Sequence, residues 1–194
     1  MANKKTRALT EDEFYLIIET IDAGFITDKG IKIKPNHRIA VALTLQANIG
    51  LRIGDIVNLR LSDIVRDGER YRLDIVEQKT KKKREFTVQN YILTCLQTYA
   101  LNNNIKSNQK LFDITVRQVQ KHLQITAEHL GLENVGTHSF RKFFAVSIYN
   151  SNGYNVELVR ELLQHSTTAV TQHYLSVSPR LVEDALAKHI KLPT

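Results

Sequence analysis

Hydrophobic residues recur every three to four positions along most of the chain, the spacing that places them on one face of an α-helix. Polar residues fill the positions between them, as expected for helices that cover a common core. The pattern predicts helices at about residues 10–21, 35–49, 53–59, 90–101, 116–130, from 138 onward, 156–164, 167–175 and 178–189.

Several of these helices begin or end at residues that are typical of helix termini. Thr10 is followed three positions later by Glu13, and this pair can satisfy the first free amides of a helix as a capping box. Thr115 and Asn155 stand at the start of two further helical patterns, where a side-chain oxygen can accept from a helix amide. Gly131 follows another pattern, and glycine readily adopts the backbone that ends a helix.

In the middle of the chain the spacing of hydrophobic residues changes to two, which predicts β-strands. Residues 71–77 and 84–88 alternate between apolar and polar side chains, and 61–65 is a candidate third strand. Asp67-Gly68 favours a turn, and the basic stretch 79–83 suits a hairpin loop. The predicted fold class is therefore α+β, mainly α with a small antiparallel β-sheet.

The chain is basic, with a formal net charge of +7 and a pI of about 9.5. A basic surface concentrates polyanions such as double-stranded DNA, although charge alone favours the simpler explanation of a solvated basic face. No apolar run approaches the length of a membrane span, and no apolar stretch follows the basic N-terminal residues. These features predict a cytoplasmic, nucleoid-associated protein with no membrane partner.

Cysteine and histidine usage argues against cross-links and metals. The single cysteine, Cys95, cannot form an internal disulfide, and its apolar helical surroundings predict a buried side chain. With one cysteine and scattered histidines, no metal site is expected.

Two arginines, two histidines and a tyrosine form a set that could attack a phosphodiester without a metal. Arginine presents a planar fork of donors that fits phosphate oxygens, and histidine exchanges protons near neutral pH. Tyrosine offers an oxygen nucleophile that can carry a covalent phosphoryl group. The residues are Arg52, His138, Arg141, His165 and, nine positions after His165, Tyr174.

Taken singly, each of these residues also has a purely structural explanation. Arg52 and Arg141 could lie on solvated helix faces, and His138 could cap a helix. His165 follows a helix, where the helix dipole favours a cation. Asp55 lies three residues after Arg52, so it could pair with Arg52 on one helix face.

In combination, these residues resemble the tyrosine recombinase (phage integrase) family. The resemblance rests on Gly50-Leu51-Arg52, a lysine in the basic hairpin, His138-Ser139-Phe140-Arg141, Leu162-Leu163-Gln164-His165 and Tyr174, in the family's order. It extends from about Leu9 to Ile190. Gln164 stands where the family usually has glycine, and glycine takes a left-handed helix end more easily than glutamine.

The resemblance implies a site-specific DNA recombinase of the integrase or invertase type that works through a 3′-phosphotyrosyl intermediate. Tyr174 is the implied nucleophile, and the two arginines and two histidines hold the phosphate, with Asp55 in support. Lys79 is the implied general acid, with Lys81, Lys82 and Lys83 as neighbouring competitors for that role. The reaction exchanges one phosphodiester for another, so no cofactor is expected. The DNA-binding residues implied are Lys81, Lys82, Lys83 and Lys142.

The expected organisation is a flexible basic N-terminus at 1–8, a catalytic domain at 9–177 and a C-terminal helix at 178–194 that could be exchanged between subunits. The expected partners are double-stranded DNA and, on paired sites, three further copies in a homo-tetramer. A monomer is expected in free solution, and accessory DNA-bending proteins are candidate further partners. Two alternatives remain: a type IB topoisomerase-like DNA-relaxing enzyme and a non-catalytic DNA-binding protein.

Overall fold

The computed structural model describes residues 6–175, which fall into two compact units. The first unit ends at Phe144 and the second begins at Ala145, so the boundary lies within helix α6 (Thr137–Ser151). The helix predicted at 178–189 lies outside the described residues, as does the whole of the proposed exchangeable segment, 178–194.

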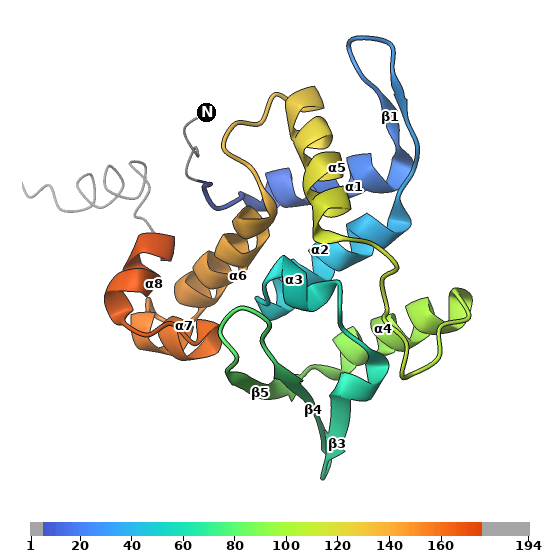
Figure 1. The fold of residues 1–194 in the computed structure, drawn as a ribbon. Helices are drawn as coiled ribbons and strands as arrows, with labels where there is room; N and C mark the ends of the chain where they lie inside the picture. Colours follow the sequence, from blue (N-terminus) through green and yellow to red (C-terminus); the bar gives the residue numbers. More distant parts are fainter. Residues whose placement is uncertain (1–5, 176–194) are drawn as a thin grey trace, which may run out of the picture. The chain divides into compact units, whose positions relative to one another are not determined.

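The core of the first unit is built on helix α1 (Glu11–Ala23), which packs against α2 (His37–Ile49) and α5 (Val116–His129) (Figure 1). The apolar faces of the helices point into the core, where Ile17 and Leu43 are completely buried. Burying one such side chain stabilises the fold by about 1.5–3 kcal/mol. Around this core the chain continues through α3 (Ile53–Ile56), a 3₁₀ turn (Leu61–Asp63) and α4 (Asn90–Asn102).

The predicted helix caps are confirmed. Thr10 and Glu13 form a capping box at the start of α1, and Thr115 forms one with Gln118 at the start of α5. Asn155 caps α7 through the amide of Leu158. The helix expected from Pro35 begins two residues later, because Asn36 accepts from the amide of Ile39 and so acts as the cap.

The predicted antiparallel sheet is also confirmed. Its three strands, β3 (Ile64–Asp67), β4 (Arg70–Val76) and β5 (Lys83–Val88), lie in the order β3-β4-β5. Val76 pairs with Lys83 at the end that carries the basic loop. The candidate strand at 61–65 is wrong in its first half, because the 3₁₀ turn occupies 61–63 and the strand begins at Ile64.

Two local features differ from the sequence prediction. A small hairpin of β1 (Phe25–Ile26) and β2 (Lys32–Ile33) occupies what reads as a loop, because strands of two residues are too short to show alternation. Cys95 is exposed rather than buried, since it lies on the outer face of α4 while Leu93 and Leu96 point into the core.

The described part of the second unit contains the end of α6, α7 (Val156–Leu163) and α8 (Thr168–Leu175). Helices α7 and α8 pack against each other, and Val159 and Leu163 are fully buried. Between the helices Gln164 adopts the left-handed conformation, with φ 51° and ψ 39°. Glutamine therefore makes the helix end for which glycine is better suited.

Candidate active site

Arg52 stands at the N-terminus of α3, directly after the left-handed end of α2. Gly50 has φ 64° and closes α2, and the buried Leu51 anchors the short connection. The backbone of Arg52 is extended and its carbonyl accepts the first hydrogen bonds of α3. The side chain keeps 21% exposure, so it is partly accessible to solvent.

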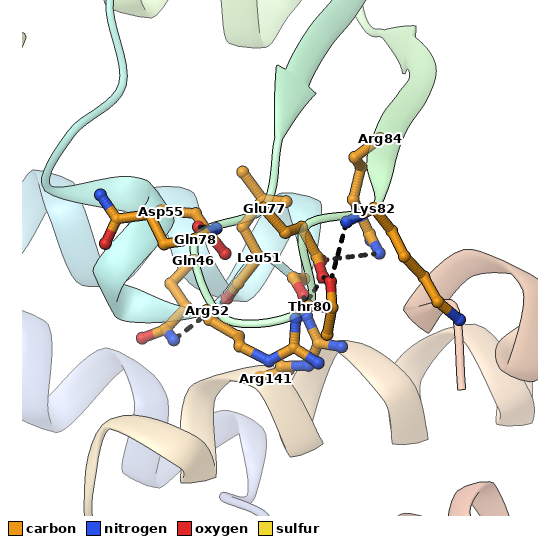
Figure 2. Close-up of polar contacts among 11 residues, drawn as sticks. Gln46, Leu51, Arg52, Asp55, Glu77, Gln78, Thr80, Lys82, Arg84 and Arg141 are labelled. Carbon is orange, nitrogen blue, oxygen red and sulfur yellow. Dashed lines mark hydrogen bonds and ion pairs between the residues drawn. The ribbon is translucent and has the colours of Figure 1, made fainter. Parts of the chain in front are cut away.

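Arg141 reaches the same region from α6. It is only 1% exposed, and its Nη1 donates to the carbonyl oxygen of Gly50 at 2.5 Å. In Figure 2 its guanidinium lies near that of Arg52. The two arginines, 89 positions apart in sequence, are thus brought together by the packing of α6 against the end of α2.

The pair predicted between Arg52 and Asp55 is not formed. Asp55 is buried, and its Oδ1 accepts from the backbone amide of Gln78 at 2.9 Å. Burial raises the pKa of Asp55 above its ordinary value, despite that hydrogen bond and the nearby arginines. The carboxylate therefore anchors the hairpin loop instead of the guanidinium three residues before it.

Arg52 pairs instead with Glu77, at the end of β4 (Figure 2). Nη1 of Arg52 donates to Oε2 of Glu77, and Thr80 Oγ1 donates to the same oxygen at 2.6 Å. On the other side, Arg84 Nη1 lies 3.5 Å from Glu77 Oε1. Both Glu77 and Arg84 are buried, at 0% and 2% exposure, so this is an internal charge network.

Burial opposes ionisation of both members of that network, with different outcomes. For Glu77, the hydrogen bond from Thr80 and the charge of Arg52 outweigh burial and lower its pKa. For Arg84, burial and the charge of Arg141 lower its pKa to about 10. Both groups are therefore ionised at neutral pH.

The sequence analysis missed Glu77 and Arg84, although β5 carries a signal for the second. Side chains alternate along a strand, and Arg84 shares a face with Phe86 and the buried Val88. A charged residue on the apolar face is uncommon unless it is paired. Its guanidinium carbon lies 5.3 Å from the centre of the Phe86 ring.

The hairpin lysines lie on and beside the loop between β4 and β5. Lys79 is exposed in the turn at residues 78–80, and Lys81 and Lys82 follow, also exposed. Lys83 begins β5 and forms ion pairs with Glu85 at 2.5 Å and Asp74 at 3.5 Å. Lys79, Lys81 and Lys82 are thus presented to solvent, as a DNA backbone contact requires.

Lys142 is placed differently from the other predicted DNA-binding residues. It is 6% exposed, and its ammonium donates to the carbonyl oxygen of Thr6 at 2.5 Å. This contact ties α6 to the segment before α1. A DNA contact by Lys142 stays a prediction, and it would require this segment to move.

His138 is the second residue of α6, on the exposed side of the helix. Partial desolvation of its ring, followed by the charges of Arg141, Lys79 and Arg52, lowers the pKa of His138. The ring is therefore neutral at pH 7, so one nitrogen can donate and the other can accept. The positive charges of Lys79 and both arginines therefore act on the ring of His138.

The second unit holds the other two predicted site residues in contact with each other. The rings of His165 and Tyr174 meet edge to face, with centroids 4.7 Å apart. His165 is buried, and its Nδ1 lies 3.1 Å from the hydroxyl of Thr171, one turn before the tyrosine. This arrangement fixes the ring of His165 beside the phenol.

The first unit therefore gathers Arg52, Asp55, Lys79, His138 and Arg141, and the second gathers His165 and Tyr174.

Within residues 6–175, no three histidine, cysteine, aspartate or glutamate side chains lie close enough to hold a metal together. None of the helices in this range has the length and hydrophobicity that crossing a bilayer requires.

Comparison with known proteins shows the family to which the chain belongs. The model of the phage integrase family matches residues 7–180. A probable integrase/recombinase of Bacillus subtilis, YoeC, is 31% identical over 137 residues, which cover 67% of this chain and 72% of the relative. Tyrosine recombinase XerC of Caldanaerobacter subterraneus is 25% identical and covers 93% of this chain. The match takes in 50% of that relative, so this chain spans about half its length.

Solved structures share the fold at low sequence identity. XerH recombinase bound to its difH substrate has a TM-score of 0.72 at 19% identity, covering 96% of this chain and 54% of XerH. The catalytic domain of bacteriophage HP1 integrase has a TM-score of 0.64 at 20% identity, and the match covers 95% of this chain and 96% of that domain. From its sequence match along most of its length and its shared fold, this chain belongs to the phage integrase family of tyrosine recombinases.

Proposed function

We propose that this chain is the catalytic part of a site-specific recombinase that cleaves and rejoins double-stranded DNA through Tyr174. The observation that carries the proposal is the meeting of Arg52, Arg141, His138 and the Lys79 loop in one unit, within a chain of this family. Two guanidinium groups beside a neutral imidazole suit a phosphate whose negative charge increases during the reaction.

In the proposed cleavage step, the phenol oxygen of Tyr174 forms a bond to phosphorus while the bond from phosphorus to the 5′ oxygen breaks. The phenol proton passes to solvent, and Lys79 gives a proton to the departing 5′ oxygen. Rejoining reverses these steps with the 5′ hydroxyl of another strand. Atoms and charges balance without ATP, because one phosphodiester replaces another.

The arginines and histidines stabilise the transition state of this step. Arg52 and Arg141 each offer several N–H donors to non-bridging oxygens, and His138 offers one more. His165 lies against the ring of Tyr174, where it can orient the phenol and contact the same phosphate. An arginine that serves another phosphoryl transfer in this way contributes about 10³–10⁵ in rate.

DNA as the partner is supported by recombinases of the same fold that were solved on DNA, XerH and lambda integrase among them. For strand exchange we propose a tetramer on two paired sites, because each of four strands needs its own nucleophile. Accessory DNA-bending proteins would belong to that assembly. A nucleoid location would follow from DNA binding.

Covalent capture tests the proposal. A duplex is first selected from a random-sequence pool by retention on the protein, and is then nicked near the candidate cleavage position so that rejoining fails. Wild-type protein should become attached to this duplex, and Tyr174→Phe should bind it without attachment, because only the nucleophilic oxygen is lost. Tyr149→Phe is the matched control and should attach normally. An adduct that persists in Tyr174→Phe rules out Tyr174 as the nucleophile.

A further inference from the structure

Glu77 is a buried carboxylate that touches both parts of the catalytic apparatus in the first unit. Its Oε2 accepts from Arg52, the proposed phosphate-binding residue, and from Thr80, which lies next to Lys79 in the hairpin turn. The side chain of Glu77 is 1% exposed and that of Arg52 is 21% exposed. One buried carboxylate therefore contacts both the partly exposed side chain of Arg52 and the loop that carries Lys79 (Figure 2).

The backbone of Glu77 also closes the loop that carries Lys79. Its amide donates to the carbonyl of Lys82, and its carbonyl accepts from the amide of Lys81, both at 3.0 Å. The next residue, Gln78, donates its amide to Asp55 on α3. The loop is thus attached at successive residues to the short helix whose N-terminus is Arg52.

Arg84 supplies the charge that makes a buried carboxylate tolerable at this place. It is 2% exposed, it contacts the carboxylate oxygen of Glu77 that Arg52 does not, and it retains its charge at neutral pH. An ionised carboxylate without partners is strongly disfavoured in a protein interior. With Arg84 behind it, Glu77 stays charged without drawing all its compensation from Arg52.

The contact to Glu77 uses only part of the hydrogen-bonding capacity of Arg52. A guanidinium carries five N–H donors, and among residues 6–175 Glu77 is the acceptor that Arg52 engages, through one of its nitrogens. The side chain of Arg52 is 21% exposed, so part of it can still be reached by a phosphate. Glu77 therefore orients Arg52 and leaves room for phosphate.

We propose that Glu77 is a positioning residue: its carboxylate fixes Arg52 and the Lys79 loop relative to each other, and Arg84 is its buried counter-charge. The phosphate-binding group and the proton donor are thereby set as one unit before DNA arrives. This inference rests on the proposed function, because it assigns Arg52 and Lys79 the roles given there.

The test compares Glu77→Gln with Glu69→Gln, an exposed glutamate in the β3–β4 turn. In single-turnover cleavage of the selected, nicked duplex, Glu77→Gln should lower the cleavage rate constant about 100-fold, since misplacing catalytic groups by about 1 Å has effects of this size. Its affinity for the duplex should stay within about threefold of wild type. Glu69→Gln should match wild type in both.

A double-mutant cycle separates positioning from a general loss of structure. If Glu77 acts through Arg52, adding Glu77→Gln to Arg52→Ala should slow cleavage much less than it slows the otherwise wild-type protein. Full additivity of the two substitutions overturns the assignment, as does a wild-type cleavage rate in Glu77→Gln.

Hydrogen exchange tests the loop without DNA, so it also distinguishes failure of this inference from failure of the proposed function. The amides of Lys81 and Gln78 should exchange faster in Glu77→Gln, while amides in the core of α5 keep their protection. Should Glu77→Gln not fold, Thr80→Val removes one hydrogen bond from the same carboxylate and should produce the same loop-specific change. Unchanged exchange at Lys81 and Gln78 in the folded variant overturns the proposal.

Discussion

Arg52 and Arg141 carry the same functional group but are held in different ways. Arg52 is partly exposed and oriented by a carboxylate, whereas Arg141 is buried and donates to the backbone of Gly50. Both arrangements restrict the side chain before DNA binds, and preorganised donors are usually the largest contribution to this kind of catalysis.

Arg52 is held in place by a carboxylate, whereas Lys82 is exposed in the hairpin loop, so we predict different effects of replacing them. Arg52→Ala should slow cleavage of the nicked duplex by about 10³-fold, because it removes a donor to the developing charge. Lys82→Ala should mainly weaken binding and reduce the salt slope of log Kd by about one, as expected for loss of one phosphate contact. Binding isotherms from low to high salt, with single-turnover rates on the same duplex, measure both. Equal effects of the two substitutions on rate and affinity would mean that Arg52 merely holds the DNA backbone.

A second residue-scale prediction concerns pH and His138. Its pKa is lowered in the folded protein, so the unfolded chain takes up a proton first as the pH falls. The free energy of unfolding contributed by this group is therefore fully present above about pH 6.5 and declines as the pH falls below that value. Urea unfolding at pH 7.5 and pH 5.5 should show a smaller difference for His138→Gln than for wild type. A larger difference in the variant would contradict the lowered pKa.

At the scale of elements, the junction between α2 and α3 combines stability and function. Gly50 ends α2 in the left-handed region, its carbonyl holds Arg141, and a Cβ on it would lie 2.4 Å from the ring of Phe144. Position 50 therefore needs a residue without a side chain that also adopts the left-handed backbone conformation, so few substitutions can be tolerated there.

Gly50→Ala should therefore lower the free energy of unfolding by about 2–5 kcal/mol, the sum of left-handed strain and overpacking. Gly68→Ala is the matched control, because Gly68 has a similar φ of 62° and no atom lies within 4 Å of the place that an added methyl group would take. It should lose about 1–2 kcal/mol from strain alone. Urea denaturation gives both values, and equal losses would show that Phe144 yields to the added methyl group.

At the scale of the whole molecule, the proposed activity depends on assembly. The sequence at 178–189, outside the described residues, carries apolar positions at helical spacing after Tyr174, the proposed nucleophile. This segment is the one that we propose to be exchanged between subunits.

We therefore predict a monomer in solution and a tetramer on paired copies of the selected duplex. Deleting residues 178–194 should reduce tetramer formation at least tenfold while changing single-duplex affinity less than threefold, because the segment would link subunits rather than contact DNA. Light scattering and native gels measure the assembly. A truncated protein that still forms the tetramer would assign the segment to packing within one subunit.

The local sequence was sufficient to predict most helices and strands and to identify the side chains available for chemistry. The capping pairs at Thr10 and Thr115, the alternation in 71–77 and the turn at Asp67-Gly68 act over a few residues, so their outcome hardly depends on the rest of the chain. The α+β class follows from the same patterns. The two-residue strands of the β1–β2 hairpin did not show, because so short a segment has no measurable period.

The tertiary structure decided how those groups are paired. The sequence suggested that Asp55 would pair with Arg52. In the fold, Arg52 pairs with Glu77, 25 positions away, and Asp55 accepts from the amide of Gln78. Packing likewise buried Arg84 against Glu77 and tied Lys142 to Thr6, 136 positions before it. Local periodicity specifies which face of an element is buried, whereas the partner of a charged side chain depends on which distant element packs against that face. For this protein, the sequence by itself determined most of the secondary structure and the chemical groups available to the site, and only the fold determined the charge network around Arg52.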